Sequence, residues 1–223
     1  MGRVMTSLPP ADGYGYLLPS GWMHLDLDPA RRQASVRRAV RRRVREEPRL
    51  GPDVARLDRL LRRECAIATA NGVERVSLLA EADGAGGLAS AAVTLVVVSI
   101  PEQFAALDAV TLLDALRSEP VADEFQSDPD ATSDVVRLSQ QEAVRLSWSQ
   151  SHALGTEPGP GAGSVTSRCW QVAVPWPGRA RAALLTLASP CEPLWPLMEV
   201  TFDACALTFH WTWCSPGERG PSD

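Results

Sequence analysis

Arginine is the residue type whose number and spacing suggest binding chemistry in this sequence. Between Asp28 and Glu64 there are 13 arginines against 6 acidic residues, a local balance of +7. The rest of the chain has 9 arginines against 21 acidic residues, a balance of −12, so the net charge of −5 conceals a separation of charge. A guanidinium binds carboxylates and phosphates through a fork of N–H donors. The segment therefore predicts a surface that faces anions.

The candidate surface lies on one predicted helix. Asp28 is a favoured N-cap, Pro29 suits the first helical position, and Pro48 ends the helix. Valines at every fourth position from Val36 to Val44 form a narrow apolar stripe, which leaves most other positions to arginine. We assign the binding surface to Arg37, Arg38, Arg41, Arg42 and Arg45. A second candidate is the loop of residues 155–164 with Trp176 nearby.

The arginine surface has several interpretations. It can bind an acidic partner protein, nucleic acid or an acidic membrane, or it can be a solvated helix face tied to acidic segments of its own chain. The balance of −12 elsewhere disfavours nucleic acid, because the remainder of the molecule would repel it. The sequence also lacks a zinc-finger or helix-turn-helix pattern. Charge runs on surface helices are common, so a solvated face is the more frequent case. Among the binding functions, an unidentified protein partner of acidic character is preferred.

Metal and cofactor chemistry is disfavoured. The residues near the C-terminus that could ligate zinc have irregular spacing and lack the short knuckle of structural zinc sites; they are Cys191, Cys205, His210 and Cys214. Cys65 and Cys205 fall on apolar helix faces and are better read as small buried hydrophobes. Asp26 and Asp28 could hold a divalent ion, but Asp28 already serves as a helix cap. We expect no metal and no cofactor.

Catalysis is disfavoured as well. The sequence has no GxSxG motif, and the three histidines, His24, His152 and His210, have no evident partner for acid–base work. The glycine-rich residues 83–87 join two predicted strands, whereas a phosphate loop needs a helix after the turn. We therefore expect a non-enzymatic binding or adaptor protein, with a hydrolase of unknown type as the alternative.

The elements that position these residues alternate between helices and strands. Expected strands span 16–27 (broken near Pro19), 73–81, 88–100, 135–139, 143–150, 170–174, 182–188 and 207–213. Expected helices begin at Pro29, Pro52 and Pro193, and a short helical crossover spans 104–117. The helix after Pro193 has an apolar face of Leu194, Leu197, Met198, Thr201, Phe202 and Cys205. Successive hairpins and a strand at 88–100 that is apolar on both faces predict a mainly antiparallel sheet with helices on both faces.

Domain organisation and compartment follow from the rest of the chain. We expect a flexible arm over residues 1–15, a single domain over 16–214 and a disordered tail over 215–223. The N-terminus lacks the apolar region of a secretory signal, and the longest apolar run, residues 88–100, is too short to span a bilayer. Five cysteines, an odd number without a CxxC pair, fit a reducing cytoplasm.

Two segments carry a resemblance to a known family. They are LPSGWMHLDLDPA (18–30), followed by the arginine-rich helix, and LLTLASPCEPLWPLMEVTFDACALTFHW (184–211). With the order of the elements, they resemble the PsbP-like sandwich, in particular a branch of uncharacterised actinobacterial proteins. The resemblance implies an α/β/α sandwich and a non-enzymatic binding subunit, and it implies an association with specialised secretion. No site residue is carried over from the family.

Overall fold

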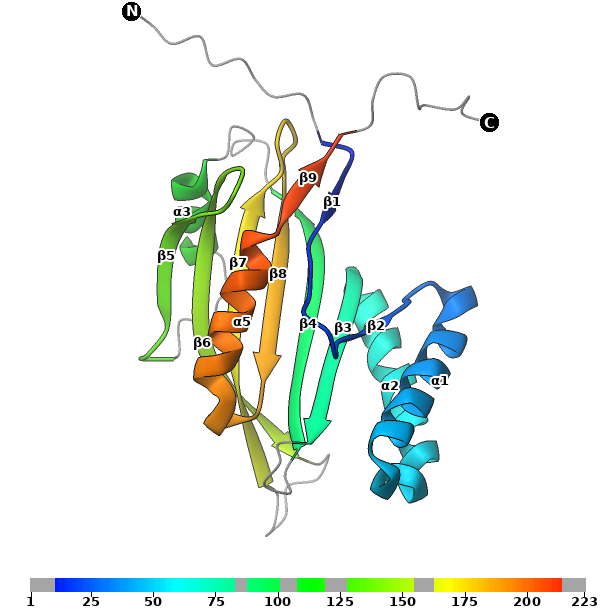
Figure 1. The fold of residues 1–223 in the computed structure, drawn as a ribbon. Helices are drawn as coiled ribbons and strands as arrows, with labels where there is room; N and C mark the ends of the chain where they lie inside the picture. The colour runs from blue at the N-terminus through cyan, green and yellow to red at the C-terminus, as the bar shows by residue number, and fades with distance from the viewer. Residues whose placement is uncertain (1–10, 83–87, 101–107, 119–127, 155–162, 214–223) are drawn as a thin grey trace, which may run out of the picture.

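A seven-stranded antiparallel sheet forms the centre of the protein (Figure 1). The computed structural model describes residues 11–82, 88–100, 108–118, 128–154 and 163–213. Every pair of neighbouring strands in the sheet is antiparallel. In spatial order the strands are β2 (Met23–Leu25), β3 (Val73–Ala82), β4 (Leu88–Ser99), β8 (Arg181–Ser189), β7 (Gly163–Pro175), β6 (Glu142–Leu154) and β5 (Thr132–Arg137).

Strand β7 shows how the sequence divides the two faces of the sheet. Successive side chains of a strand point to opposite faces. Trp170, Val172 and Val174 are buried in one apolar cluster, whereas Ala173 is buried in another. The register pairs Val172 with Leu185 of β8, which belongs to the same cluster. The sheet therefore carries a separate apolar layer on each face.

Helix α5 (Trp195–Leu207) covers the first face and lies in front of the central strands in Figure 1. It begins after a short 3-10 turn, η4 (Glu192–Leu194). Met198, Phe202 and Cys205 are at least 96% buried, as the helical spacing predicts. Leu197, expected on the same face, is 60% exposed, so this part of the prediction is wrong. The helix contacts β7 and β8 through its inner side only.

Three helices cover the opposite face. Helices α1 (Pro29–Glu46) and α2 (Val54–Ala70) pack beside β2 and β3, and α3 (Ala109–Ser118) packs on β6 at the other end of the sheet (Figure 1). Between α1 and α2 the chain forms a 3-10 helix, η1 (Pro48–Asp53). The predicted fold class, a mainly antiparallel sheet with helices on both faces, is confirmed.

The helical cover of that second face is incomplete in the middle. On β4, Val93 and Leu95 face the α5 side and are fully buried. Thr94 and Val96 alternate with them and are only half-buried. The strand is thus apolar on both faces, as predicted, but helices do not seal both faces along its whole length.

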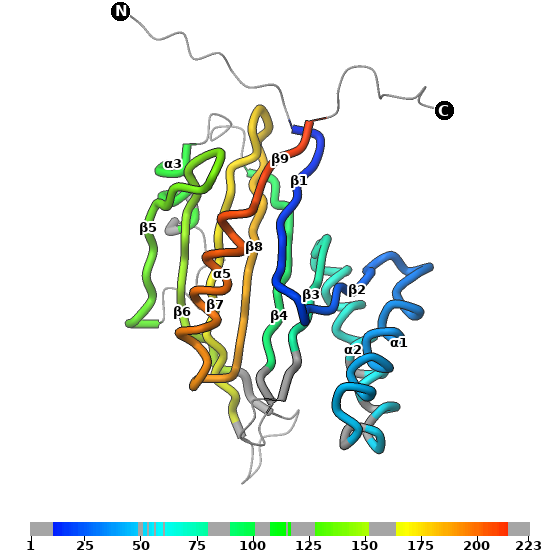
Figure 2. Tube along the Cα trace, in the orientation of Figure 1, coloured from blue at the N-terminus to red at the C-terminus, as the bar shows by residue number. Residues whose placement is uncertain are grey.

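The two ends of the described chain pair with each other. Strand β1 (Gly13–Gly15) runs antiparallel to β9 (His210–Thr212) in a separate two-stranded sheet, which Figure 2 shows as adjacent blue and red segments. Ala11, just before β1, is completely buried. The prediction of a flexible arm is therefore wrong over residues 11–15, because the aromatic side chains of the C-terminal segment give this stretch an apolar surface to pack on.

Two other strand predictions were too long. The strand expected over 16–27 is reduced to β2, and the one expected over 207–213 is reduced to β9, because α5 continues through Leu207. The expected crossover is helical from Ala109, while residues 101–107 and the tail over 215–223 lie outside the described residues. The assignment of residues 16–214 to a single domain stays a prediction.

Candidate functional site

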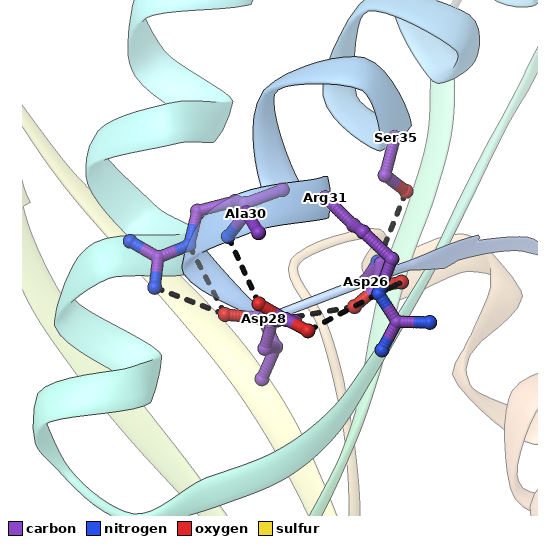
Figure 3. A network of polar contacts seen from close by, with 7 residues as sticks. Asp26, Asp28, Ala30, Arg31 and Ser35 are labelled. Atoms are coloured by element: carbon purple, nitrogen blue, oxygen red, sulfur yellow. Dashed lines mark hydrogen bonds and ion pairs between the residues drawn. The ribbon is translucent and has the colours of Figure 1, made fainter.

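The arginine-rich helix α1 begins in a compact polar network (Figure 3). Asp28 Oδ1 accepts a hydrogen bond of 2.9 Å from the Ala30 N–H, which chiefly holds the pKa of Asp28 below its usual value. Arg31 Nε lies 3.2 Å from a carboxylate oxygen of Asp28 and 3.2 Å from one of Asp26, and the Ser35 hydroxyl accepts from the Asp26 N–H. Both carboxylates thus belong to the network at the start of the helix, and Asp28 is the N-cap, as predicted.

The five predicted arginines lie together on the solvent side of α1. Their side chains are exposed, and with Ala34 they line a surface hollow of about 580 Å³. The residues are Arg37, Arg38, Arg41, Arg42 and Arg45, which we call the arginine face. The valine stripe on the other side of the helix, with Val36 and Val40 buried, sets this orientation.

Most of the arginine face has no acidic partner inside the described part of the protein. Arg42 Nε lies 2.8 Å from Glu46 Oε1, one turn along the same helix. Among the residues that the structure describes, no carboxylate lies within 4.0 Å of Arg37, Arg38, Arg41 or Arg45. Four cationic side chains are therefore available to an external anion.

Repulsion between these side chains makes a testable prediction about stability. Arg41 stands three or four residues from Arg37, Arg38 and Arg45, and like charges at this spacing destabilise a helix by about 0.2–0.5 kcal/mol per pair. At low ionic strength, we expect Arg41→Gln to raise the free energy of unfolding by between a few tenths of a kcal/mol and about 1 kcal/mol. Urea titrations at low and high salt measure this gain, which should shrink as salt screens the charges.

The matched control is Arg63→Gln on helix α2, an exposed arginine outside the arginine face. It removes the same charge and should change stability by less. A stability gain at Arg41 that is unchanged in high salt would contradict charge repulsion as its cause.

Arg43 lies on the opposite, buried side of α1 and was not distinguished from its neighbours by the sequence analysis. Its side chain packs with the buried Ala39 and Val40 and leaves the residue only 7% exposed. The signal was in the sequence: Arg43 stands three residues after Val40 and seven after Val36, so it falls on the apolar stripe. The two sides of one helix thus carry arginines in opposite environments.

Trp176 is not a surface anchor, and that prediction is wrong. The residue is 7% exposed, and its Nε1–H donates a hydrogen bond of 3.0 Å to the buried carbonyl oxygen of Ala11. The centroids of the Trp176 and Trp211 rings lie 4.5 Å apart. The ring of Trp176 also meets the ring of Tyr14 edge-on. The N-terminal segment that covers the indole was not foreseen. Residues 155–162 of the candidate loop lie outside the described residues.

The cysteines and histidines do not assemble into a metal centre within the described ranges. There, no group of three or more His, Cys, Asp or Glu side chains could hold an ion. Cys65 and Cys205 are buried, as predicted, and burial raises the pKa of Cys205 to about 12. Such a thiol stays protonated at neutral pH and is a poor nucleophile or ligand.

One histidine meets a serine. His24 Nδ1 lies 2.7 Å from Ser77 Oγ, across the antiparallel pair β2–β3. Ser77 is completely buried, so a substrate carbon has no access to its hydroxyl oxygen. His210 Nδ1 lies 3.0 Å from the carbonyl oxygen of Thr208, a partner that holds the ring against the backbone. Neither arrangement supports the hydrolase alternative.

Comparisons with known proteins give likenesses of fold. No protein-family model and no curated protein matches the chain. The solved structure of LpqN from Mycobacterium tuberculosis, described as involved in cell envelope biogenesis, is 10% identical over 92% of this chain and 86% of LpqN, with a TM-score of 0.43. That of a cyanobacterial PsbP from Synechocystis is 16% identical over 95% and 98% of the two chains, with a TM-score of 0.40. In the described ranges no helix is long and apolar enough to cross a membrane.

Proposed function

We propose that this protein is a non-enzymatic binding protein that docks on an acidic surface of a partner protein through its arginine face. One observation carries the proposal: five exposed guanidiniums share one side of α1, and only Arg42 has a carboxylate partner among the described residues. Unpaired arginines held on a rigid helix suit planar, bidentate recognition of carboxylates. A cytoplasmic location and a link with specialised secretion stay predictions.

The charge distribution favours a protein partner over a polyanion. The acidic excess outside residues 28–64 repels nucleic acid and anionic membrane beyond the reach of the arginine face. A protein partner presents a local acidic patch and can avoid that repulsion. The short length of the arginine face, about two turns of one helix, fits a local patch.

The decisive experiment is affinity capture from the native cell with charge-reversed variants. In the test variant, Arg38 and Arg41 are changed to glutamate. We expect the principal captured partner to have an acidic surface and its recovery to fall at least about tenfold, because attraction becomes repulsion at the centre of the contact. Mass spectrometry of the captured proteins measures the recovery.

The matched control changes Arg63 and Arg137 to glutamate, which alters the net charge equally at exposed sites outside the arginine face. It should retain the partner. Equal losses in both variants, with both folded by circular dichroism, would refute the proposed surface. Capture of nucleic acid in place of a protein, with affinity that falls steeply as salt rises, would replace the proposal with the nucleic-acid alternative.

A further inference from the structure

A second candidate site lies on the buried side of the same helix. A cavity of about 360 Å³ opens between the α1–α2 pair and strands β3, β4 and β8. It is within the size range of small-molecule sites. Among the described residues that line it, all are apolar apart from Arg43, Ser90 and Ser167; Met23, Val40, Leu57, Leu61 and Leu78 are representative.

Arg43 gives this apolar cavity its one charge. The side chain is 9% exposed, and among the described residues Nε and Nη2 have no hydrogen-bond partner. Its ion-pair contact is long, 3.9 Å from Nη1 to Glu46 Oε2, and the other oxygen of Glu46 binds Arg42 at 2.8 Å. A guanidinium cannot lose its proton in a protein, so the distant and shared carboxylate of Glu46 compensates this buried charge only in part, and two of its nitrogens remain open to an external anion.

The unpartnered atoms define the shape of that anion. The Nε–H and the neighbouring N–H of Nη2 lie on one edge of the planar guanidinium and point the same way, which matches the two oxygens of a carboxylate. Nη1, the atom already near Glu46, is on the other edge. The open edge therefore suits a bidentate contact with an acidic head group.

The remaining lining defines the rest of the ligand. A sugar or nucleotide would need several polar partners, and besides Arg43 the described lining of the cavity offers two serines. An extended peptide would need a free strand edge, but Leu78 and Ala92 are paired on both sides within the sheet. An alkyl chain needs neither polar partners nor a free strand edge. Apolar burial alone stabilises it, by roughly 0.8 kcal/mol per buried methylene.

We infer that this cavity binds a long-chain fatty acid. Its alkyl chain packs between the helix pair and the sheet, and its carboxylate accepts two hydrogen bonds from the Nε–Nη2 edge of Arg43. The inference is independent of the proposed partner surface, because Arg43 and the arginine face lie on opposite sides of α1.

Native mass spectrometry and thermal shift on the delipidated full chain test the inference with three probes. Hexadecanoate should form a complex of one molecule per chain and raise the melting temperature. Hexadecanol, with the same chain and no charge, should bind about tenfold or more weakly, because a buried charge-assisted contact is lost. Acetate, with the head group alone, should have no effect. Equal binding of acid and alcohol, or binding of neither by the folded protein, would overturn the assignment.

Variants locate the site. Arg43→Met keeps the length of the side chain and should remove the preference for the acid over the alcohol. Without ligand it should not lower stability, because the buried unpaired charge is gone. Arg41→Met on the arginine face is the matched control and should keep the preference, because Arg41 has no ion pair with Glu46. Leu61→Trp should fill the cavity and abolish binding of both chains. An Arg43→Met protein with the wild-type preference for the acid would refute the role of Arg43.

Discussion

Replacing Phe202 with alanine is expected to lower the free energy of unfolding by about 3–5 kcal/mol. The side chain is fully buried in the large apolar cluster between α5 and the sheet. Its removal loses the transfer free energy of the ring and leaves a cavity that α5, held between β8 and β9 in sequence, can close only in part. Urea denaturation followed by circular dichroism measures the loss, and the melting temperature should fall by about 2–4 °C per kcal/mol.

Leu197 on the same helix is the control for this prediction. It is 60% exposed on the outer side of α5, so Leu197→Ala should change stability by no more than about 0.5 kcal/mol. Both variants keep the same helix and replace an apolar residue with alanine. If Phe202→Ala and Leu197→Ala lowered the free energy of unfolding by the same amount, the inner and outer faces of α5 would be assigned wrongly.

The second large effect is expected at Trp176. Because the indole is buried against Tyr14 and Trp211 and hydrogen-bonded to Ala11, Trp176→Ala should destabilise the protein by about 3–5 kcal/mol. Arg179 and Arg181 also lie over this ring, with their guanidinium carbons 5.5 and 5.8 Å from its centroid. A residue that served a partner from the surface would give a stable variant with a binding defect.

Trp176→Phe separates the two parts of that loss. Phenylalanine keeps an aromatic ring in the cluster but leaves the Ala11 carbonyl oxygen without its donor. We therefore expect a smaller loss of stability than in Trp176→Ala. The lost hydrogen bond should account for about 1 kcal/mol or somewhat more of it. Thermal unfolding and near-ultraviolet circular dichroism follow both variants. Unchanged stability in Trp176→Ala would contradict the burial of this residue and support the original surface assignment.

Local signals in the sequence predicted most of the elements. Asp28 and Pro29 fixed the start of α1 to the residue, since an N-cap and a first-turn proline act within a few residues of themselves. Gly72, with a φ of 74°, follows the end of α2, where glycine commonly ends a helix. The hairpins were equally accessible, because alternation and turn residues are local properties.

Contacts between distant segments could not be predicted in the same way. Three residues of β1 carry too little pattern to signal a strand, and their partner in β9 is almost the whole chain away. The burial of Trp176 depends on that same pairing, since Ala11 directly precedes β1. The arginine face could be assigned because helical spacing alone separates it from the valine stripe. The lack of hydrogen-bond partners at Nε and Nη2 of Arg43 could not be predicted, because it depends on how α1 packs against α2.

The pairing of β1 with β9 also has a consequence for biosynthesis. A nascent chain leaves the ribosome N-terminus first, so β1 emerges long before the segment that completes its ladder has been translated. Contacts of such large sequence separation slow folding, because the intervening polypeptide must first be brought into place. Closure of the aromatic cluster at this edge is therefore a late event in synthesis, and stalling translation before residue 209 should leave the N-terminal segment accessible to protease.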